Sequence, residues 1–455
     1  MSALFTNLLA WAAALIDTIF AVLANLFRGL VALVGLGRRA WDLRRGEGTL
    51  LSRLAPHLLT PAGQRAVFAV MRAFLPVLVI PRPLVRAYPS SATVIVTRRA
   101  DVLDVLRRDQ DFAVVYEPRM RELTGGANFF LGMQPGADYE RDHSAMRLAM
   151  RRTDAADMIA PFVAGRAAEI VAAAGGDLDV PRDLTRPVAA EMAARYFGVP
   201  DGGALADWTT TLFWFLFNAL PADPAVGARA RSAAAGLREA IDAAVAARKA
   251  DGADADDVLG RCLALQAAET PGMDDRGIRD NLLGLLIGAI PTLSKAATLA
   301  LDELLDRPDA LRVAQAAARS GDDGLMEAHV WEALRFRPHN PVIYRRALRD
   351  VRLPRSTLRG RKIPEGAMVF AATHSAMFDG LDIPDPDQFR TDRLFDAYIH
   401  WGHGMHACFG DAINRAFIPA VLKPVLAAPD LRRAGPRDDA GTPFPASLPV
   451  TFAAG

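Results

Sequence analysis

The sequence predicts a mainly α-helical protein with small β-sheets. Four long Ala- and Leu-rich segments space their apolar residues close to the helical period: 156–174, 226–249, 276–306 and 323–336. Strand-like pieces are short, and the clearest are 93–97 and 368–371. Beyond about residue 50, no repeat, low-complexity tract or long linker requires a second domain. We therefore expect an N-terminal hydrophobic segment over 1–45 and one folded domain over 46–455.

Composition points to a protein that acts on small molecules. The formal net charge is +1 and no long basic stretch occurs, so nothing supports nucleic-acid binding and we predict none. The only two cysteines, Cys262 and Cys408, lie far apart, so disulfides do not hold the fold together and a cytoplasmic location is the default. We interpret Cys262, inside an Ala- and Leu-rich helix, as an ordinary core residue.

The first element is an almost wholly apolar segment over 8–27, interrupted by Asp17 and Asn25. Roughly 20 such residues suffice to cross a bilayer as a helix. No positive charge precedes the segment, which argues against a secretory signal. Four arginines follow it at 38, 39, 44 and 45, and positive residues tend to stay on the cytoplasmic side. Two interpretations stay open: a membrane anchor or interfacial helix, or a helix packed on the protein itself.

The most informative element is a glycine-rich loop that reads Trp-Gly-His-Gly-Met-His-Ala-Cys-Phe-Gly over 401–410. A helix-compatible run over 411–426, which Pro419 should kink, follows Cys408 directly. The positive end of this helix and nearby N–H groups favour a thiolate, as an anionic iron ligand requires. The glycines at 402, 404 and 410 allow a tight turn and a close approach to a flat cofactor.

Zinc is the alternative ligand for this loop. Its candidate ligands are His400, His403, His406 and Cys408. Zinc binding leaves the glycines and the helix after the cysteine unexplained. Covalent c-type haem is excluded, because Cys-x-x-Cys-His is absent.

The loop resembles the cytochrome P450 signature Phe-Gly-x-Gly-x-His-x-Cys-x-Gly, with Trp401 in place of the usual Phe. The resemblance continues in order over about residues 85–425. It implies the family's mainly helical, triangular fold as a single domain. It also implies a non-covalent haem b whose iron is bound by Cys408.

Two pairs of residues support the resemblance. Glu332 and Arg335 form the only Glu-x-x-Arg and share a helix face. Alone this spacing is typical of a surface ion pair, but in the family the motif, completed here by Arg393, is a structural lock. His143 and Arg147 form the only His-x-x-x-Arg, and such donors suit haem propionates. A solvent-facing basic turn is the alternative for this second pair.

By the same resemblance, Arg345 and His406 match two further propionate contacts. Segment 281–292 resembles the family's central helix, whose usual motif is Ala/Gly-Gly-x-Asp/Glu-Thr. Thr292 matches its catalytic threonine, but Pro291 stands where the acid is expected. A proline inside a helix frees the carbonyl four residues back, so hydroxyl groups or water could carry protons there. A packing kink alone is the other interpretation.

The resemblance implies a monooxygenase that inserts one oxygen atom from O2 into an apolar organic substrate. No stretch resembles a flavin- or nicotinamide-binding domain, so the electrons would come from a separate ferredoxin or flavoprotein partner. The missing acid makes a peroxide-using peroxygenase, or a hydroperoxide isomerase on a lipid-like substrate, the second hypothesis. A non-catalytic haem- or zinc-binding protein is the third. The apolar stretches 208–217 and 128–131 suggest a greasy substrate, although any buried helix looks the same.

Overall fold

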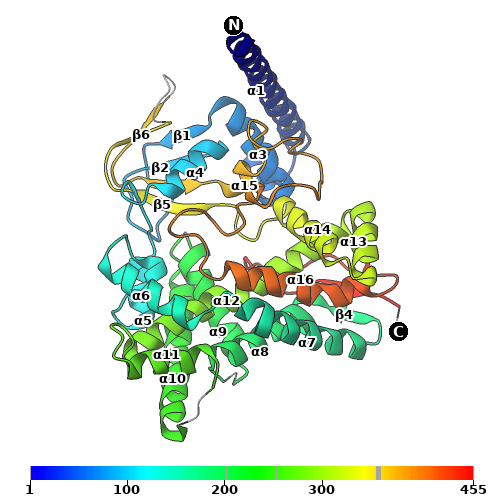
Figure 1. Cartoon of the computed structure of the whole chain (residues 1–455). Coiled ribbons are helices and arrows are strands. Elements are labelled where there is room, and N and C mark those ends of the chain that lie inside the picture. The colour runs from blue at the N-terminus through cyan, green and yellow to red at the C-terminus, as the bar shows by residue number, and fades with distance from the viewer. Residues whose placement is uncertain (1, 201, 253–254, 355–359, 454–455) are drawn as a thin grey trace. The chain divides into compact units, whose positions relative to one another are not determined.

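The computed structural model describes the backbone of residues 2–200, 202–252, 255–354 and 360–453, and the side chains from Ile16 onward. The chain forms two compact units. Unit 1 comprises Met1–Leu84, Ser90–Phe112 and Arg335–Met405, and unit 2 comprises Val85–Pro89, Ala113–Leu334 and His406–Gly455. As predicted, helices predominate and the sheets are small (Figure 1).

Unit 1 is built on a sheet with the strand order β1-β2-β8-β5-β3. The strands are β1 (Val77–Ile80), β2 (Thr93–Val96), β8 (Met368–Ala371), β5 (Ile343–Ala347) and β3 (Phe112–Ala113). The two predicted strands are confirmed as β2 and β8, which pair in parallel with Val94 opposite Val369. Both valines lie in the apolar core of the unit because alternate side chains of a strand share a face. A separate hairpin joins β6 (Val351–Leu353) to β7 (Arg361–Ile363).

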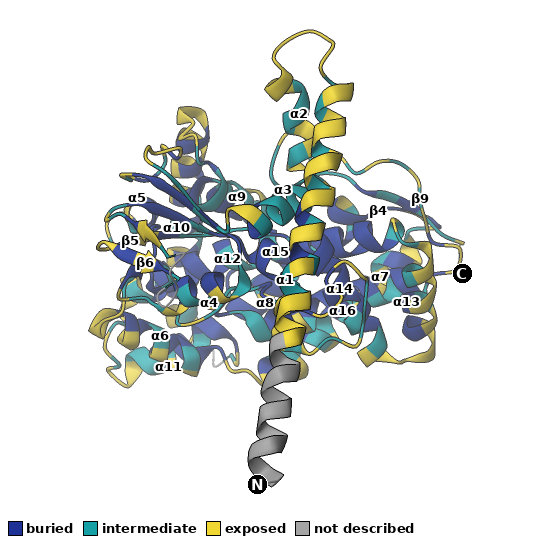
Figure 2. Cartoon of the chain, turned by 90° about the horizontal axis from the view of Figure 1, so that it is seen from above, coloured by how far each residue is buried: buried dark blue, intermediate teal, exposed yellow. Residues whose placement is uncertain are grey.

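The N-terminal helix α1 (Ser2–Asp42) is fastened to unit 1. It packs along α3 (Pro61–Phe74), where a Cβ on Gly29 would lie 2.3 Å from the Cβ of Ala73. Asn25 donates a 3.1 Å hydrogen bond to Asp379. Much of α1 is exposed (Figure 2), and its exposed residues include apolar ones such as Phe20, Phe27 and Val31. The side chains of residues 8–15, the first part of the predicted segment 8–27, lie outside the described residues.

Three shorter helices and one 3-10 turn complete unit 1: α2 (Leu50–Leu59), α4 (Arg99–Arg107), α15 (Thr373–Ala376) and η5 (Phe395–Ala397).

Unit 2 surrounds the long helix α12 (Asp275–Leu305), which packs against α8 (Arg186–Phe197), α9 (Leu205–Phe213), α10 (Pro224–Asp251) and α16 (Asp411–Ala427) (Figure 1). Its remaining helices are α5 (Glu117–Thr124), α6 (Ala137–Ala149), α7 (Ala160–Ala173), α11 (Val258–Ala267), α13 (Pro308–Ser320) and most of α14 (Asp323–Phe336). Four helical turns join them: η1 (Phe130–Gly132), η2 (Ala155–Ile159), η3 (Val180–Thr185) and η4 (Trp214–Asn218). A small sheet has the order β4 (Asp177–Asp179), β10 (Pro449–Thr451), β9 (Arg432–Arg433).

All four predicted helical segments are confirmed, as η2 with α7, α10, α12 and α14. Aspartates begin α10, α11, α12 and α14: the side chain of Asp274, for example, accepts a hydrogen bond from the Gly277 N–H at the start of α12. Helix α12 continues through Pro291 and α16 continues through Pro419, so neither proline ends its helix. The predicted core residue Cys262 is buried in α11, with its sulfur 3.9 Å from that of Met146.

Candidate cofactor site around Cys408

Backbone geometry explains two of the three glycines in the cysteine loop. Gly402 and Gly404 both have φ of +79°, the left-handed region that favours glycine. A Cβ on Gly404 would also lie 2.3 Å from the carbonyl oxygen of Leu106. Gly410 differs, because its φ of −92° is open to any residue, so its backbone conformation does not require glycine; its close approach to a flat cofactor stays a prediction.

Cys408 lies at the N-terminal end of α16, as predicted, and its side chain is partly buried. The Asn414 amide, one turn into the helix, donates to Sγ at 3.6 Å. Burial raises the pKa of the thiol, whereas the Gly410 N–H, the Asn414 amide and Arg147 act in the opposite direction. The predicted stabilisation of the thiolate is therefore present, but burial outweighs it in the protein alone.

Helix α6 brings His143 and Arg147 to the residue after the cysteine. Arg147 donates to the Phe409 carbonyl at 2.9 Å, and its guanidinium lies 3.6 Å from the centre of the Phe409 ring. The His143 ring meets the same phenyl ring edge-on at 5.1 Å and stacks on Tyr139. The ring of Tyr139 in turn contacts His406 at 5.5 Å. The structure thus groups four predicted residues, His143, Arg147, His406 and Cys408, and the alternative of a solvent-facing basic turn is wrong.

This donor set fits the predicted haem. A soft sulfur ligand held by two N–H donors is the kind of group that binds haem iron. The guanidinium and the two imidazoles beside it are donors that suit the carboxylates of such a cofactor. Burial lowers the pKa of His143, so at neutral pH this ring is a neutral partner rather than a cation.

Helix α12 supplies Thr292. The helix is almost entirely buried, and its half-buried positions around the threonine are Gly288, Ala289, Thr292 and Lys295, which follow one stripe. A Cβ on Gly288 would meet nothing within 4 Å, so open space adjoins this stripe. The Thr292 hydroxyl donates to the carbonyls of Gly288 and Ala289, which leaves its oxygen lone pairs as acceptors.

No carboxylate of α12 stands near the threonine. The closest along the helix is Asp302, ten residues on, which is about 15 Å along the helix axis. The acid–alcohol pair that the motif would require is therefore incomplete on α12, as the sequence indicated.

The predicted lock holds a loop of unit 1. Arg335 is fully buried and donates to the carbonyls of Met377, Pro386 and Gln388 at 2.7 to 3.1 Å. Arg393 donates to the same Gln388 oxygen at 2.9 Å. Glu332 is also fully buried, so the alternative of a surface ion pair is wrong.

Arg345 is buried on β5 in unit 1 and donates to the carbonyl of Tyr344 at 3.0 Å. Its role as a propionate contact stays a prediction. The zinc alternative gains no support: Nε2 of His403 accepts a 2.6 Å hydrogen bond from Arg107. Within the described ranges, no group of three or more His, Cys, Asp or Glu side chains is placed to hold a metal ion.

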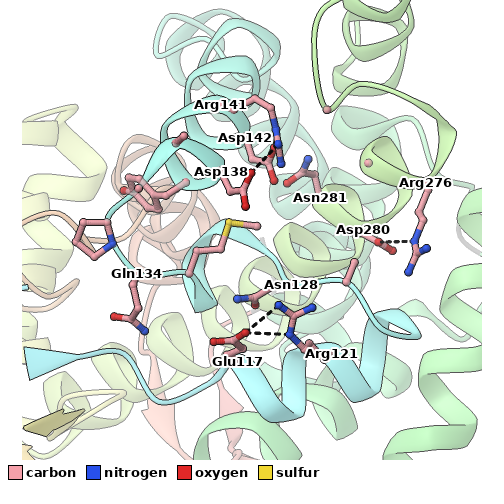
Figure 3. Close-up of a pocket in the computed structure, with 18 of the residues that line it drawn as sticks. Glu117, Arg121, Asn128, Gln134, Asp138, Arg141, Asp142, Arg276, Asp280 and Asn281 are labelled. Carbon is pink, nitrogen blue, oxygen red and sulfur yellow. Dashed lines mark hydrogen bonds and ion pairs between the residues drawn. The ribbon is translucent and has the colours of Figure 1, made fainter. Parts of the chain in front are cut away.

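A large pocket of about 780 Å³ lies between α5, α6 and the start of α12, and charged side chains line it (Figure 3). Its arginines are paired: Arg121 with Glu117, Arg141 with Asp138, and Arg276 with Asp280. In the predicted lining stretch 128–131, Asn128 faces this polar pocket, whereas Phe129 and Phe130 are buried in the core. The role of these two phenylalanines in lining an apolar substrate pocket stays a prediction.

The sequence analysis missed three residues of this region. Tyr139 could have been found by helical spacing, because it lies four residues before His143 on the same helix. Asn414 carried no such signal, because it lies six residues after Cys408, which precedes the helix. Lys295 carried a stronger signal, since it is the one basic residue of the sequence between Arg279 and Arg307 in an otherwise apolar helix.

Comparison with known proteins relates the chain to one family. Residues 204–427 match the family model described as Cytochrome P450. The erythromycin C-12 hydroxylase of Saccharopolyspora erythraea is 27% identical over 342 residues, which cover 73% of this chain and 81% of that protein. The linoleate diol synthase of Gaeumannomyces graminis is 37% identical over 87 residues, or 19% of this chain and 7% of that protein.

Solved structures share the fold. The crystal structure of CalO2 aligns with a TM-score of 0.71 and 22% identity, covering 87% of this chain and 97% of that one. P450BioI, solved in complex with hexadec-9Z-enoic acid ligated acyl carrier protein, aligns with a TM-score of 0.72 and 18% identity, covering 86% of this chain and 99% of that one.

Proposed function

We propose that this chain, which belongs to the cytochrome P450 family and is a monooxygenase with haem b, binds the haem iron through Cys408 and oxygenates an apolar organic substrate. The observation that carries the proposal is the position of Cys408 at the start of α16, with Arg147 of α6 bonded to the next residue. When bound, a thiolate-ligated haem supplies the oxidant for inserting one oxygen atom from O2.

The residues of the chain then have distinct tasks. The Gly410 N–H and the Asn414 amide hold the sulfur, and Arg147, His143 and His406 suit the cofactor carboxylates. Arg345 is a further candidate for the same carboxylates. The Thr292 hydroxyl donates its proton to backbone carbonyls of α12. Its oxygen can therefore accept a hydrogen bond from a water molecule that carries the proton.

The test is the carbon monoxide difference spectrum of the reduced protein. We expect the wild type to give the band of thiolate-ligated haem and Cys408→Ser to lose it. Cys262→Ser is the matched control, because it removes the only other cysteine of the sequence, which is buried away in α11. A Cys408→Ser protein that keeps the band would refute the ligand assignment.

A second candidate function is peroxide-driven or hydroperoxide-rearranging chemistry on a lipid. Pro291 favours it, because the chain lacks the acid that would accompany Thr292 in proton delivery. The similarity over 87 residues to a protein named linoleate diol synthase supports it as well. Product formed with hydrogen peroxide, but not with a ferredoxin and its reductase, would select this candidate, and the opposite result would select the O2-dependent reaction.

We also propose that α1 attaches the protein to a membrane, with the catalytic part in the cytoplasm. An 18-residue window within Ile16–Asp42 has a mean hydropathy of 2.1, and Phe20 and Leu23 are 66% and 55% exposed. Exposed apolar side chains continue past the buried Asn25, since Phe27 and Leu30 are 67% and 53% exposed. Flotation of the full chain with liposomes tests this: Phe20→Glu with Leu23→Glu should abolish it, and Leu148→Glu, at an exposed site on α6, should not.

A further inference from the structure

A small cavity beside the central helix carries two cations. Its lining residues come from four elements of unit 2: Arg186, Thr210, Pro291, Ser294, Lys295, Phe444 and Pro445. Its volume is about 10 Å³, which is room for about one water molecule or one oxygen atom of a larger group. None of these lining residues is acidic, so the cavity is positively charged.

Lys295 lacks an anionic partner. Across the part of the chain that the structure describes, its ammonium has neither an ion pair nor a hydrogen bond, and its neighbour is the face of the Phe444 ring at 5.3 Å. Burial lowers the pKa of Lys295 to about 8, while Asp439 acts in the opposite direction. Lys295 is half-buried, so its ammonium has lost part of its hydration without gaining a counter-charge, and a ligand anion would supply that charge.

The surrounding polar groups are already engaged. Asp439 accepts hydrogen bonds from Nε and one terminal nitrogen of Arg437 at 2.8 and 3.0 Å, so Arg437 compensates much of its charge. The Ser294 hydroxyl lies 2.9 Å from that of Thr185. Arg186 contacts only the carbonyl of Pro445 at a long 3.5 Å among the residues described, so its charge also lacks a carboxylate.

Buried aromatic rings adjoin the cavity. The Phe444 ring meets Phe213 of α9 at 5.8 Å, and Phe213 packs on Phe217 at 4.4 Å. Lys295 is three residues after Thr292 on the same half-buried stripe, so the two lie about 4.5 Å apart along the helix axis. The Lys295 ammonium and the Phe444 and Phe213 rings therefore lie close to Thr292, the residue that the proposed oxygenation uses.

We propose that Lys295, supported by Arg186, binds the carboxylate of an amphipathic acid, such as a fatty acid, and so selects the substrate of the enzyme. The carboxylate places one oxygen in the cavity and its alkyl chain along the Phe444 and Phe213 rings. This inference rests on the proposed function, because it names the substrate class of the same site. It assigns Lys295 to recognition and gives it no part in the oxidation.

The experiment compares dodecanoic acid with its methyl ester, titrated calorimetrically into the full-length, haem-loaded protein without any reductant. The wild type should bind the acid more tightly than the ester. Lys295→Met should weaken binding of the acid by about tenfold or more, because a charge-assisted hydrogen bond is lost, and leave the ester unchanged. Lys295→Arg should keep most of the acid affinity. Lys362→Met, at a lysine paired with Asp350 on the surface of unit 1, is the matched control.

An acid-to-ester affinity ratio that is the same in the wild type and in Lys295→Met would overturn the proposal. If Lys295→Met does not fold, the test uses the wild type, whose lysines are labelled by reductive ¹³C-methylation. The NMR resonance of Lys295 is the one that is missing from the Lys295→Arg spectrum. This resonance should shift when the acid is added and should not shift when the ester is added. The absence of such a shift would equally overturn it. Failure of the proposed function itself would appear separately, as loss of the carbon monoxide band in the wild type.

Discussion

Replacing Arg335 with methionine tests whether the buried arginine holds the loop of unit 1. Its guanidinium donates to Met377 O at 3.1 Å, Pro386 O at 2.7 Å and Gln388 O at 3.0 Å. It also lies 4.5 and 4.3 Å from the ring centres of Phe336 and Phe378, contacts that a methionine side chain can partly replace.

The expected cost follows from the carbonyls that lose their donor. Gln388 O keeps its hydrogen bond from Arg393, so two buried carbonyls, those of Met377 and Pro386, are left without this partner. At about 1–3 kcal/mol for each unsatisfied group, Arg335→Met should lower the free energy of unfolding by about 2–6 kcal/mol. That is a large part of the roughly 5–15 kcal/mol that stabilises a typical protein.

Urea unfolding followed by circular dichroism measures this cost. Arg346→Met is the control, since Arg346 of β5 is also in unit 1 but is exposed, and its replacement should cost less than about 0.5 kcal/mol. A loss below about 1 kcal/mol in Arg335→Met would refute the reasoning, because the carbonyls would then have found other donors.

Three further predictions concern the site and the pH dependence of stability. Arg147→Met should lower the ratio of haem to protein after purification, and the exposed Arg152→Met should not; equal ratios would contradict the role given to Arg147. With a reductase system, Pro291→Glu should raise the fraction of consumed electrons that is recovered as oxygenated product. Pro291→Ala, which restores only the backbone N–H, should leave this fraction unchanged. Equal fractions in the two variants would show that the missing acid does not limit the enzyme. Burial raises the pKa of Asp101 to about 6, so the folded state binds this proton before the unfolded chain does, and this contribution to the free energy of unfolding grows as the pH falls from about 7 toward 4. Asp101→Asn should accordingly raise the thermal midpoint at pH 8 and change it little at pH 4, and an unchanged midpoint at pH 8 would contradict this.

Local patterns predicted the long helices, because the spacing of apolar residues in segments such as 276–306 reports directly which face is buried. Short strands such as β4 and β10 were not predicted, since three residues carry too little pattern and their pairing joins Leu178 to Val450 across most of the sequence. The same limit applies to the site. The motif indicated Cys408, His143 and Arg147, but the contact of Arg147 with Phe409 depends on how α6 and α16 fold against each other.

Lys295 shows where a motif misleads. The family pattern directed attention to Thr292 and to the proline before it, while the lysine three residues later matched nothing and was passed over. Its meaning required the cavity, because only tertiary structure shows that Arg186 and Phe444 converge on it.

The continuity of α1 has a mechanical consequence. The helix passes without a break from its exposed N-terminal part through Asn25 and Gly29, where it is fastened to unit 1. A protein held to a bilayer through such a helix has no flexible joint between the membrane-bound part of α1 and unit 1. The tilt of the helix in the bilayer therefore fixes the tilt of unit 1. Encounters with a soluble electron donor would then occur from a restricted range of directions, and inserting a flexible linker ahead of Asn25 would widen that range.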